Sequence, residues 1–432
     1  MTAADRLLAQ AAGQVNAGDL AAAWNSYLTA AQAVPGHPQA WLGLGMVALL
    51  RRDWALAALL ADKRQTLAGD GFAYFHDLLT AMMGHGLSPL VEALGAHLPA
   101  ESPYGLSQMY YQSCARLLAG DEDGAFALLG RLKPRLAALA ATLPIGPEDR
   151  FNVAYRQATL IEDGDYPDAL DPQRIAAAAA RLPALTALRP WPAAQAAPFV
   201  LLAAADGPYL RRFAADFLES ADASVEGAVV HLHAIAADDE TLAGLAAAAA
   251  ACRNPVMLTA EDAAAHGGGA YCASARFLVA GALMARYGRP LMITDLDIRF
   301  IRPLGDLAEA ARPFAFASFV HDGWGPCSRL PAVLTWFAAD ADGAAMLEAA
   351  RHTILSKLDV PWPHNWMLDQ AALMTARRWL RRRRPRAGIG EFNTLLGRSF
   401  EHFLVCSGDE EDKAALIRAA ARAGAAPLPP VP

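Results

Sequence analysis

The 432-residue sequence predicts an α + α/β fold, in which an all-α domain precedes a mixed, mostly parallel α/β domain. Three observations support this prediction. Apolar residues recur at helical spacing up to about residue 180, prolines accumulate over 182–198, and short apolar runs then alternate with helical stretches. We therefore expect a helical domain over 1–185, a Pro/Ala-rich linker over 186–198, an α/β domain over 199–410, and a C-terminal helix with a Pro-rich tail over 411–432.

Composition and charge argue against several classes of protein. The net charge of −7 disfavours binding of nucleic acid over a broad surface. Because no apolar stretch reaches the roughly 18 residues of a spanning helix, no integral membrane segment is expected. The N-terminal stretch carries Asp5 and does not fit a signal peptide, so a cytoplasmic location is expected. The five cysteines are widely spaced, which indicates neither a disulfide framework nor a zinc ribbon.

A self-similarity organises the beginning of the chain. Asp19 in "GDLAAAWNSYLTAAQAVP" and Asp53 in "RDWALAALLADKRQTLAG" are 34 positions apart (53 − 19 = 34), which is the period of a helix-turn-helix tetratricopeptide unit. Residues 6–70 resemble such repeats, which have small residues at helix crossings, large ones in the groove and a proline in the turn. The matching positions are Ala23, Tyr27, Ala30, Pro35, Trp41, Leu44 and Gly45. Residues 71–180 also have helical spacing and fit either further repeats or a generic helical bundle.

In the second half, strands are expected at "PFVLLAAAD", "GAVVHLHAI", "PVMLTA" and "PLMITDLDI", with helices between them. This order is typical of βαβ units and a mostly parallel sheet. His231 and His233 share one face of the second of these strands. A zinc site is one interpretation of such a pair, but no third ligand accompanies it, so a packed or hydrogen-bonded pair is the favoured interpretation.

Two carboxylates follow the apolar strand "LMIT". Side chains two residues apart in an extended segment point to the same side, so Asp295 and Asp297 are expected to converge at the carboxyl end of the strand. In open α/β sheets, ligands bind at that edge. Two close carboxylates favour a cation, and oxygen ligands select Mg²⁺ or Mn²⁺, which can bridge a diphosphate. The alternative interpretation is a solvated turn.

The segment from Phe199 to about Lys413 resembles GT-A-fold nucleotide-diphosphosugar glycosyltransferases of the glycogenin and bacterial lipopolysaccharide galactosyltransferase type. Their metal-binding Asp-x-Asp motif is similar to Asp295-Leu296-Asp297. Further residues are implied by the resemblance in this order along the chain: Asp206 and Tyr209 of "AADGPYL" at the nucleobase, and Arg276 of "YCASARFL" at the donor.

The same resemblance implies residues near the transferred sugar and a third metal ligand. Asp369-Gln370 of "NWMLDQAAL" matches an Asp-Gln pair beside the sugar, and His402 matches a late histidine ligand, although the glycine and lysine that follow it are more widely spaced than in the family. Independently, His321 and Trp324 of "HDGW" follow the apolar run "FAFASFV". They are expected at a strand end, where an aromatic ring can contact a sugar face.

These features together predict an enzyme, a glycosyltransferase that uses Mn²⁺ or Mg²⁺ to move a sugar from a nucleoside-diphosphate donor to a protein or glycan acceptor recruited by the helical repeats. One alternative is a tetratricopeptide scaffold with a non-catalytic nucleotide-sugar-binding domain. Another is a metal-dependent phosphate hydrolase. The basic run "RRWLRRRRPR", Arg377 to Arg386, leaves peripheral membrane contact or docking of another anionic partner open.

Overall fold

The computed structural model has two compact units, which confirms the α + α/β prediction. One unit comprises Met1–Asp163 with Asp322–Pro326, and the other comprises Gly164–His321 with Cys327–Pro432. The first is helical and the second contains a mixed sheet. The structure describes residues 2–98, 104–139, 158, 160–161, 170–191, 197–262, 268–321, 325–360 and 365–405.

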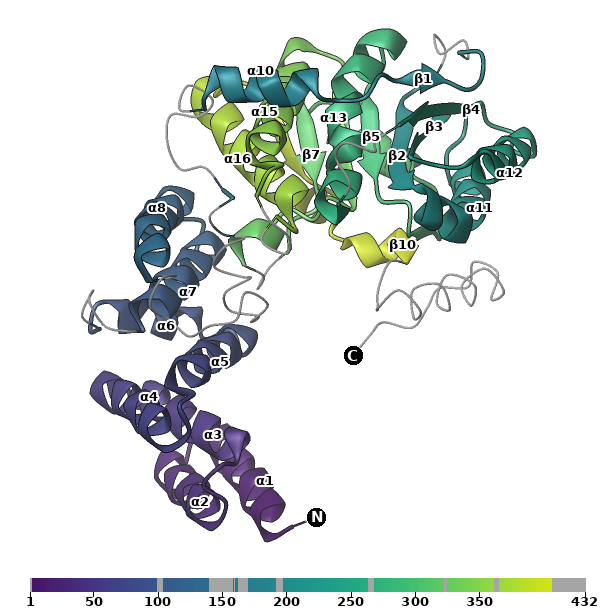
Figure 1. The fold of residues 1–432 in the computed structure, drawn as a ribbon. Helices are drawn as coiled ribbons and strands as arrows, with labels where there is room; N and C mark the ends of the chain where they lie inside the picture. Colours follow the sequence, from purple (N-terminus) through teal and green to yellow (C-terminus); the bar gives the residue numbers. More distant parts are fainter. Residues whose placement is uncertain are drawn as a thin grey trace. The chain divides into compact units, whose positions relative to one another are not determined.

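The helical unit consists of helices that each pack on the next one along the chain (Figure 1). Their bounds are α1 (Ala3–Asn16), α2 (Leu20–Ala33), α3 (Pro38–Leu50), α4 (Trp54–Ala68), α5 (Gly71–Gly84), α6 (Ser88–Gly95), α7 (Gly105–Leu118) and α8 (Glu122–Leu139).

The two aspartates that defined the 34-residue spacing have the same structural task. Asp19 caps α2 by accepting the N–H of Ala22 at 3.0 Å, and Asp53 caps α4 by accepting the N–H of Leu56 at 3.1 Å. Such N-caps satisfy backbone donors that the first helical turn leaves without a partner, and each contributes about 1 kcal/mol. The sequence repeat is therefore a repeat of helix starts.

Close packing between α3 and α5 requires a glycine. A Cβ added at Gly45 would lie 2.3 Å from the hydroxyl oxygen of Tyr74. The Tyr74 hydroxyl donates to the carbonyl of Trp41 at 3.1 Å, and the Tyr74 side chain is buried. Gly45 thus lets the two helices approach closely enough for this buried hydrogen bond.

The second unit is built on an eight-stranded sheet, counted over the described residues, with the order β1-β4-β3-β2-β5-β8-β7-β9. The central run β4-β3-β2-β5 is parallel, as is the β7-β9 pair, whereas β1-β4, β5-β8 and β7-β8 are antiparallel. The strands are β1 (Thr186–Ala187), β2 (Val200–Asp206), β3 (Val229–Ile235), β4 (Val256–Glu261), β5 (Leu291–Thr294), β7 (Phe316–Ser318), β8 (Leu334–Phe337) and β9 (Ile389–Glu391); β6 (Arg299–Phe300) and β10 (Leu404–Val405) form a separate pair.

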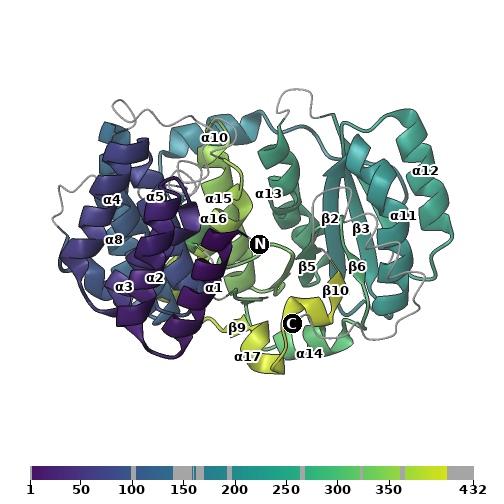
Figure 2. The same ribbon diagram turned by 90° about the horizontal axis from the view of Figure 1, so that it is seen from below.

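Helices cover both faces of this sheet (Figure 2). On one face lie α11 (Gly207–Ser224) and α12 (Asp239–Ala250), and on the other lie α13 (Gly269–Tyr287), α15 (Ala341–Lys357) and α16 (Leu368–Arg383). Because both faces are covered, β2 and β3 are buried along almost their whole length. The remaining elements are α10 (Pro172–Ala180), α14 (Gly305–Ala311), α17 (Phe392–Leu396), and the short 3-10 helices η1 (Pro326–Ser328) and η2 (Phe400–His402).

The division between the units lies earlier in the chain than the predicted one. Helix α10, which the sequence analysis placed in the helical domain, packs against α15 of the sheet-containing unit. Strand β1 lies in the predicted linker and pairs with β4 at the sheet edge. Neither contact is visible as local periodicity, because both depend on partners that are far away in the sequence.

No helix in the part of the chain that the structure describes is both long enough and apolar enough to traverse a bilayer.

A buried polar chain lies between β3, β4 and α13. Thr259 bridges the two strand histidines, since its Oγ1 is 2.9 Å from Nε2 of His231 and 2.9 Å from Nδ1 of His233. The Tyr287 hydroxyl lies 2.8 Å from Nδ1 of His231, and Glu261 Oε2 lies 3.2 Å from Nε2 of His233. The histidine pair is therefore the hydrogen-bonded strand pair that the sequence analysis favoured over a zinc site.

His231 predicts a specific acid sensitivity of the fold. Burial, with a smaller contribution from the neighbouring His233, lowers the pKa of His231 to about 3, whereas a histidine in the unfolded chain titrates near 6.5. As pH falls below about 6.5, the unfolded state takes up a proton that the folded state excludes, so the free energy of unfolding falls by roughly 1.4 kcal/mol per pH unit towards pH 3. His231→Gln is expected to make the free energy of unfolding less dependent on pH, by about one bound proton or roughly 1.4 kcal/mol per pH unit. Urea unfolding between pH 4 and pH 7 measures this change. The exposed His85→Gln is the matched control, and equal slopes for the two variants would contradict the assignment.

Candidate active site

A cavity of about 630 Å³ opens at the carboxyl ends of β2 and β5. Elements from separate parts of the second unit line it: the end of β2, the first turns of α11, α13 and α16, and the segment after β5. The cavity brings together seven residues that the sequence analysis singled out, and their roles stay predictions: Asp206, Tyr209, Arg276, Asp295, Asp297, Asp369 and Gln370.

Local sequence explains the positions of the aspartates that follow strands. Strand β5 is buried on both faces, and the chain stays buried at Leu296 while the residues on either side of it, Asp295 and Asp297, line the cavity. Asp206 ends β2 and caps α11, because its Oδ1 accepts the N–H of Tyr209 at 3.0 Å. Asp295 and Asp297 thus lie directly after the end of β5, where the chain bends at Leu296 and Asp297, and a helix cap places Asp206 at the same edge of the sheet.

Arg276 is the cation at the centre of the cavity. It is only 3% exposed. Its Nη2 donates to Oδ2 of Asp369 at 2.9 Å, and its Nη1 forms a short hydrogen bond with Oδ1 of Asp295. Asp369 is itself buried, whereas 32% of the Asp295 side chain is exposed. The guanidinium thus joins an acid after β5 to an acid on α16.

The cavity has a marked excess of negative charge. Its lining contains four aspartates and one arginine, which gives a formal charge of −3 (1 − 4 = −3). Burial raises the pKa of Asp295; Arg276 opposes this shift, and Asp297 and Asp369 add to it. Burial also raises the pKa of Asp369 against the effect of Arg276. Because the neighbouring acids raise the pKa of Asp295, a cation that faces its carboxylate would be stabilised here.

The residues present fit a hard divalent cation that is completed by a ligand. Mg²⁺ is commonly bound through one or two carboxylates together with substrate phosphates, and Asp295 and Asp297 supply two such carboxylates in one cavity. Over the residues that the structure describes, no group of three His, Cys, Asp or Glu side chains is arranged to hold a metal ion. Among the described residues, Asp295 and Asp297 are thus the two carboxylates that could hold such a cation.

Two predicted residues that the structure describes do not line the cavity. His402 lies in η2, where its Nε2 is 2.6 Å from Nη1 of Arg398, and it does not line the cavity. The structure therefore gives no support to His402 as the third ligand. His321 follows β7, its N–H donates to the carbonyl of Arg329 at 2.9 Å, and it too is absent from the lining. Trp324 lies outside the described residues.

The sequence analysis missed two residues at the cavity, Trp366 and Met367. Trp366 is 43% exposed, which is unusual for so large an apolar side chain. Met367 has a φ of 69° and precedes α16 in the left-handed region, which costs a side-chain-bearing residue about 1–2 kcal/mol. Both lie within three residues of Asp369 in the sequence, but neither exposure nor a left-handed φ can be recognised from the residue types.

Comparisons with known proteins give only distant likenesses. No protein-family model matches the sequence, and no curated protein matches it. Among solved structures, the apo form of mouse xyloside xylosyltransferase 1 has 12% identity and a TM-score of 0.26, over 45% of this chain and 84% of that one. A mutant of Thermobaculum terrenum O-GlcNAc transferase has 17% identity and a TM-score of 0.18, over 67% of this chain and 46% of that one. Because both TM-scores are low, these likenesses do not assign the chain to a family.

Proposed function

We propose that this chain is a metal-dependent glycosyltransferase that moves a sugar from a nucleoside-diphosphate donor to a protein or glycan acceptor. The observation that carries the proposal is the single cavity in which Asp295, Asp297, Arg276 and Asp369 meet at the carboxyl edge of the sheet. In this proposal the sheet-containing unit is GT-A-like and the helical hairpins are tetratricopeptide-like and recruit the acceptor.

The donor's diphosphate has several sources of attraction in this cavity. The helices α11, α13 and α16 all place residues of their first turn in the lining, namely Tyr209, Gly269 and Asp369. The N-terminal ends of helices carry partial positive charge, which favours phosphate groups. The excess of carboxylates opposes this attraction, so an anionic donor needs a cation held by Asp295 and Asp297.

Each protein group has a proposed task during transfer. A bound Mn²⁺ or Mg²⁺ supplies stabilisation of the negative charge on the leaving nucleoside diphosphate. Arg276 adds a buried guanidinium whose effect is strengthened by exclusion of water. Asp369 and Gln370 hold the hydroxyls of the sugar, Asp206 and Tyr209 bind the nucleoside side, and the exposed ring of Trp366 offers a stacking face.

A panel of nucleotide sugars tests the proposal. We expect one donor to raise the melting temperature of the full chain only when Mn²⁺ is present, by the equivalent of about 3–4 kcal/mol at 100 to 1,000 times Kd. With an acceptor, the products should be glycosylated acceptor and nucleoside diphosphate. Release of inorganic phosphate from simple nucleotides would instead favour the hydrolase, and the absence of any stabilising donor would contradict the proposal.

One observation favours a second candidate, a non-catalytic nucleotide-sugar-binding domain on a tetratricopeptide-like scaffold. Arg276 already provides a cation to Asp295 and Asp369, and it can attract a diphosphate without a metal. This candidate predicts that a nucleotide sugar stabilises the chain equally with and without Mn²⁺, and that no product forms. The same panel therefore separates the two.

A further inference from the structure

The turn that precedes α16 holds a strained residue beside the active-site cavity. The N–H of Leu368 donates to the carbonyl of Asn365 at 3.2 Å, which closes a tight turn, and Met367 has its φ of 69° at the third position of that turn. A positive φ at this position usually selects glycine, because L side chains rarely adopt the left-handed conformation. A side chain that is kept in such a conformation beside a cavity points to a functional role.

The side chain of Met367 contacts Gln370 in the first turn of α16. Nε2 of Gln370 donates to Sδ of Met367 at 2.9 Å, and both residues line the cavity at the carboxyl ends of β2 and β5. A thioether sulfur accepts hydrogen bonds but has no proton to donate. If the amide were turned around, its oxygen would face the sulfur, and two acceptors would be in contact. The sulfur therefore selects one of the two orientations of the Gln370 amide.

This orientation leaves the amide oxygen of Gln370 for a ligand. In the part of the chain that the structure describes, Oε1 of Gln370 accepts no hydrogen bond. The neighbouring carboxylate is already engaged, since Oδ1 of Asp369 accepts the backbone N–H of Gln370 at 2.8 Å and Oδ2 accepts Nη2 of Arg276 at 2.9 Å. Of these two adjacent residues, Gln370 thus presents the acceptor that has no partner.

We propose that Met367 is a positioning residue of the active site. Its sulfur fixes the Gln370 amide so that Oε1 accepts a hydrogen bond from one hydroxyl of the bound donor sugar. Holding the amide in this orientation before binding removes an ordering cost from the complex. The inference rests on the proposed function and gives the contact a direction, in which the sugar donates and the protein accepts. Fluorine in place of that hydroxyl has nearly the same size but no proton to donate.

A series of nucleotide sugars in which one hydroxyl at a time is replaced by fluorine tests this direction. The donor that stabilises the chain is compared with its fluorinated forms, and calorimetry on the full chain with Mn²⁺ measures the dissociation constants. We expect fluorine at one position to weaken binding about threefold to tenfold, the value of one hydrogen bond. Gln370→Leu should abolish this difference, whereas Gln370→Glu, which keeps acceptor oxygens, should preserve it.

Two substitutions of Met367 separate the sulfur from the backbone. Met367→Leu keeps the volume but removes the acceptor for Gln370, whereas Met367→Gly suits the left-handed backbone but removes the side chain. Both should reduce the fluorine effect to less than about half, because the amide can then rotate. Met367→Gly should do so without loss of thermal stability, since glycine relieves the backbone strain.

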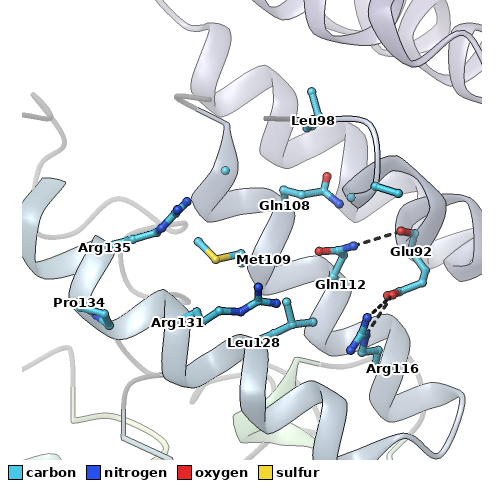
Figure 3. Close-up of a pocket in the computed structure, with 13 residues that line it drawn as sticks. Glu92, Leu98, Gln108, Met109, Gln112, Arg116, Leu128, Arg131, Pro134 and Arg135 are labelled. Carbon is cyan, nitrogen blue, oxygen red and sulfur yellow. Dashed lines mark hydrogen bonds and ion pairs between the residues drawn. The ribbon is translucent and has the colours of Figure 1, made fainter. Parts of the chain in front are cut away.

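Met109→Leu is the matched control. Met109 also lines a cavity, but a different one, between α6, α7 and α8 of the helical unit (Figure 3). The same exchange of methionine for leucine is made there without altering the turn before α16. Met109→Leu should therefore leave the fluorine effect unchanged.

A measurement without donor or metal checks the contact itself. In the full chain with isotope-labelled methionine methyl groups, Gln370→Leu should shift the methyl resonance of Met367 and leave that of Met109 in place. The two resonances are identified by their loss in Met367→Leu and Met109→Leu. An unshifted Met367 resonance overturns the inference, because the sulfur then does not contact the amide.

The binding results overturn the inference in three further cases. These are a fluorine effect that is absent at every position of the sugar, one that survives Gln370→Leu, and one that is equal in Met367→Leu and Met109→Leu. A chain that binds no nucleotide sugar overturns the proposed function and this inference together. A bound donor without a fluorine effect overturns the inference alone.

Discussion

Arg276→Met is expected to lower the free energy of unfolding by about 3–5 kcal/mol, because it leaves Asp295 and Asp369 close together without their shared cation. Methionine keeps the apolar stem that packs in the core but removes the guanidinium, which also lies 5.2 Å from the ring centroid of Phe277. Urea unfolding at neutral pH measures the loss. The loss should shrink in acid, where protonation removes the charge of the two carboxyls.

Arg253→Met is the matched control for this substitution. Arg253 also pairs with a carboxylate, Oδ2 of Asp222 at 3.1 Å, but its side chain is 78% exposed, and such surface pairs contribute about 0–1 kcal/mol. In the double variant Arg276→Met with Asp369→Asn, part of the lost stability should return, because one of the uncompensated charges is gone. Equal losses for Arg276→Met and Arg253→Met would show that the buried guanidinium is not the compensating charge.

Local signals predicted those parts of the structure that depend on neighbours in the sequence. The spacing of Asp19 and Asp53 predicted a repeated helix-turn-helix unit, and in the structure each aspartate caps the helix that follows it. The apolar run before Asp295 predicted a buried strand, and the alternation of side chains predicted that Asp295 and Asp297 share one cavity. These features need no knowledge of the distant chain.

Features that depend on distant contacts were not predicted. The chain from Arg276 to Asp369 spans 93 residues, and no local pattern shows that these two residues form an ion pair. The docking of α10 on α15 and the pairing of β1 with β4 shifted the division of the chain for the same reason.

Asp297→Asn is expected to reduce the proposed metal-dependent sugar transfer by roughly a hundredfold to a thousandfold, the usual effect of removing one preorganised group that stabilises transition-state charge. Asp297 is a sharper test than Asp295, because replacing Asp295 would also break its ion pair with Arg276 and would lower stability. The matched control is Asp306→Asn, which removes the same charge from an exposed position in the first turn of α14.

Asn remains a neutral oxygen ligand, so raising the Mn²⁺ concentration should recover part of the activity of Asp297→Asn, whereas Asp306→Asn should need no extra metal. If Asp297→Asn instead transfers sugar at the normal rate and with the normal Mn²⁺ requirement, the pair of carboxylates after β5 does not hold the metal, and Arg276 alone must face the diphosphate.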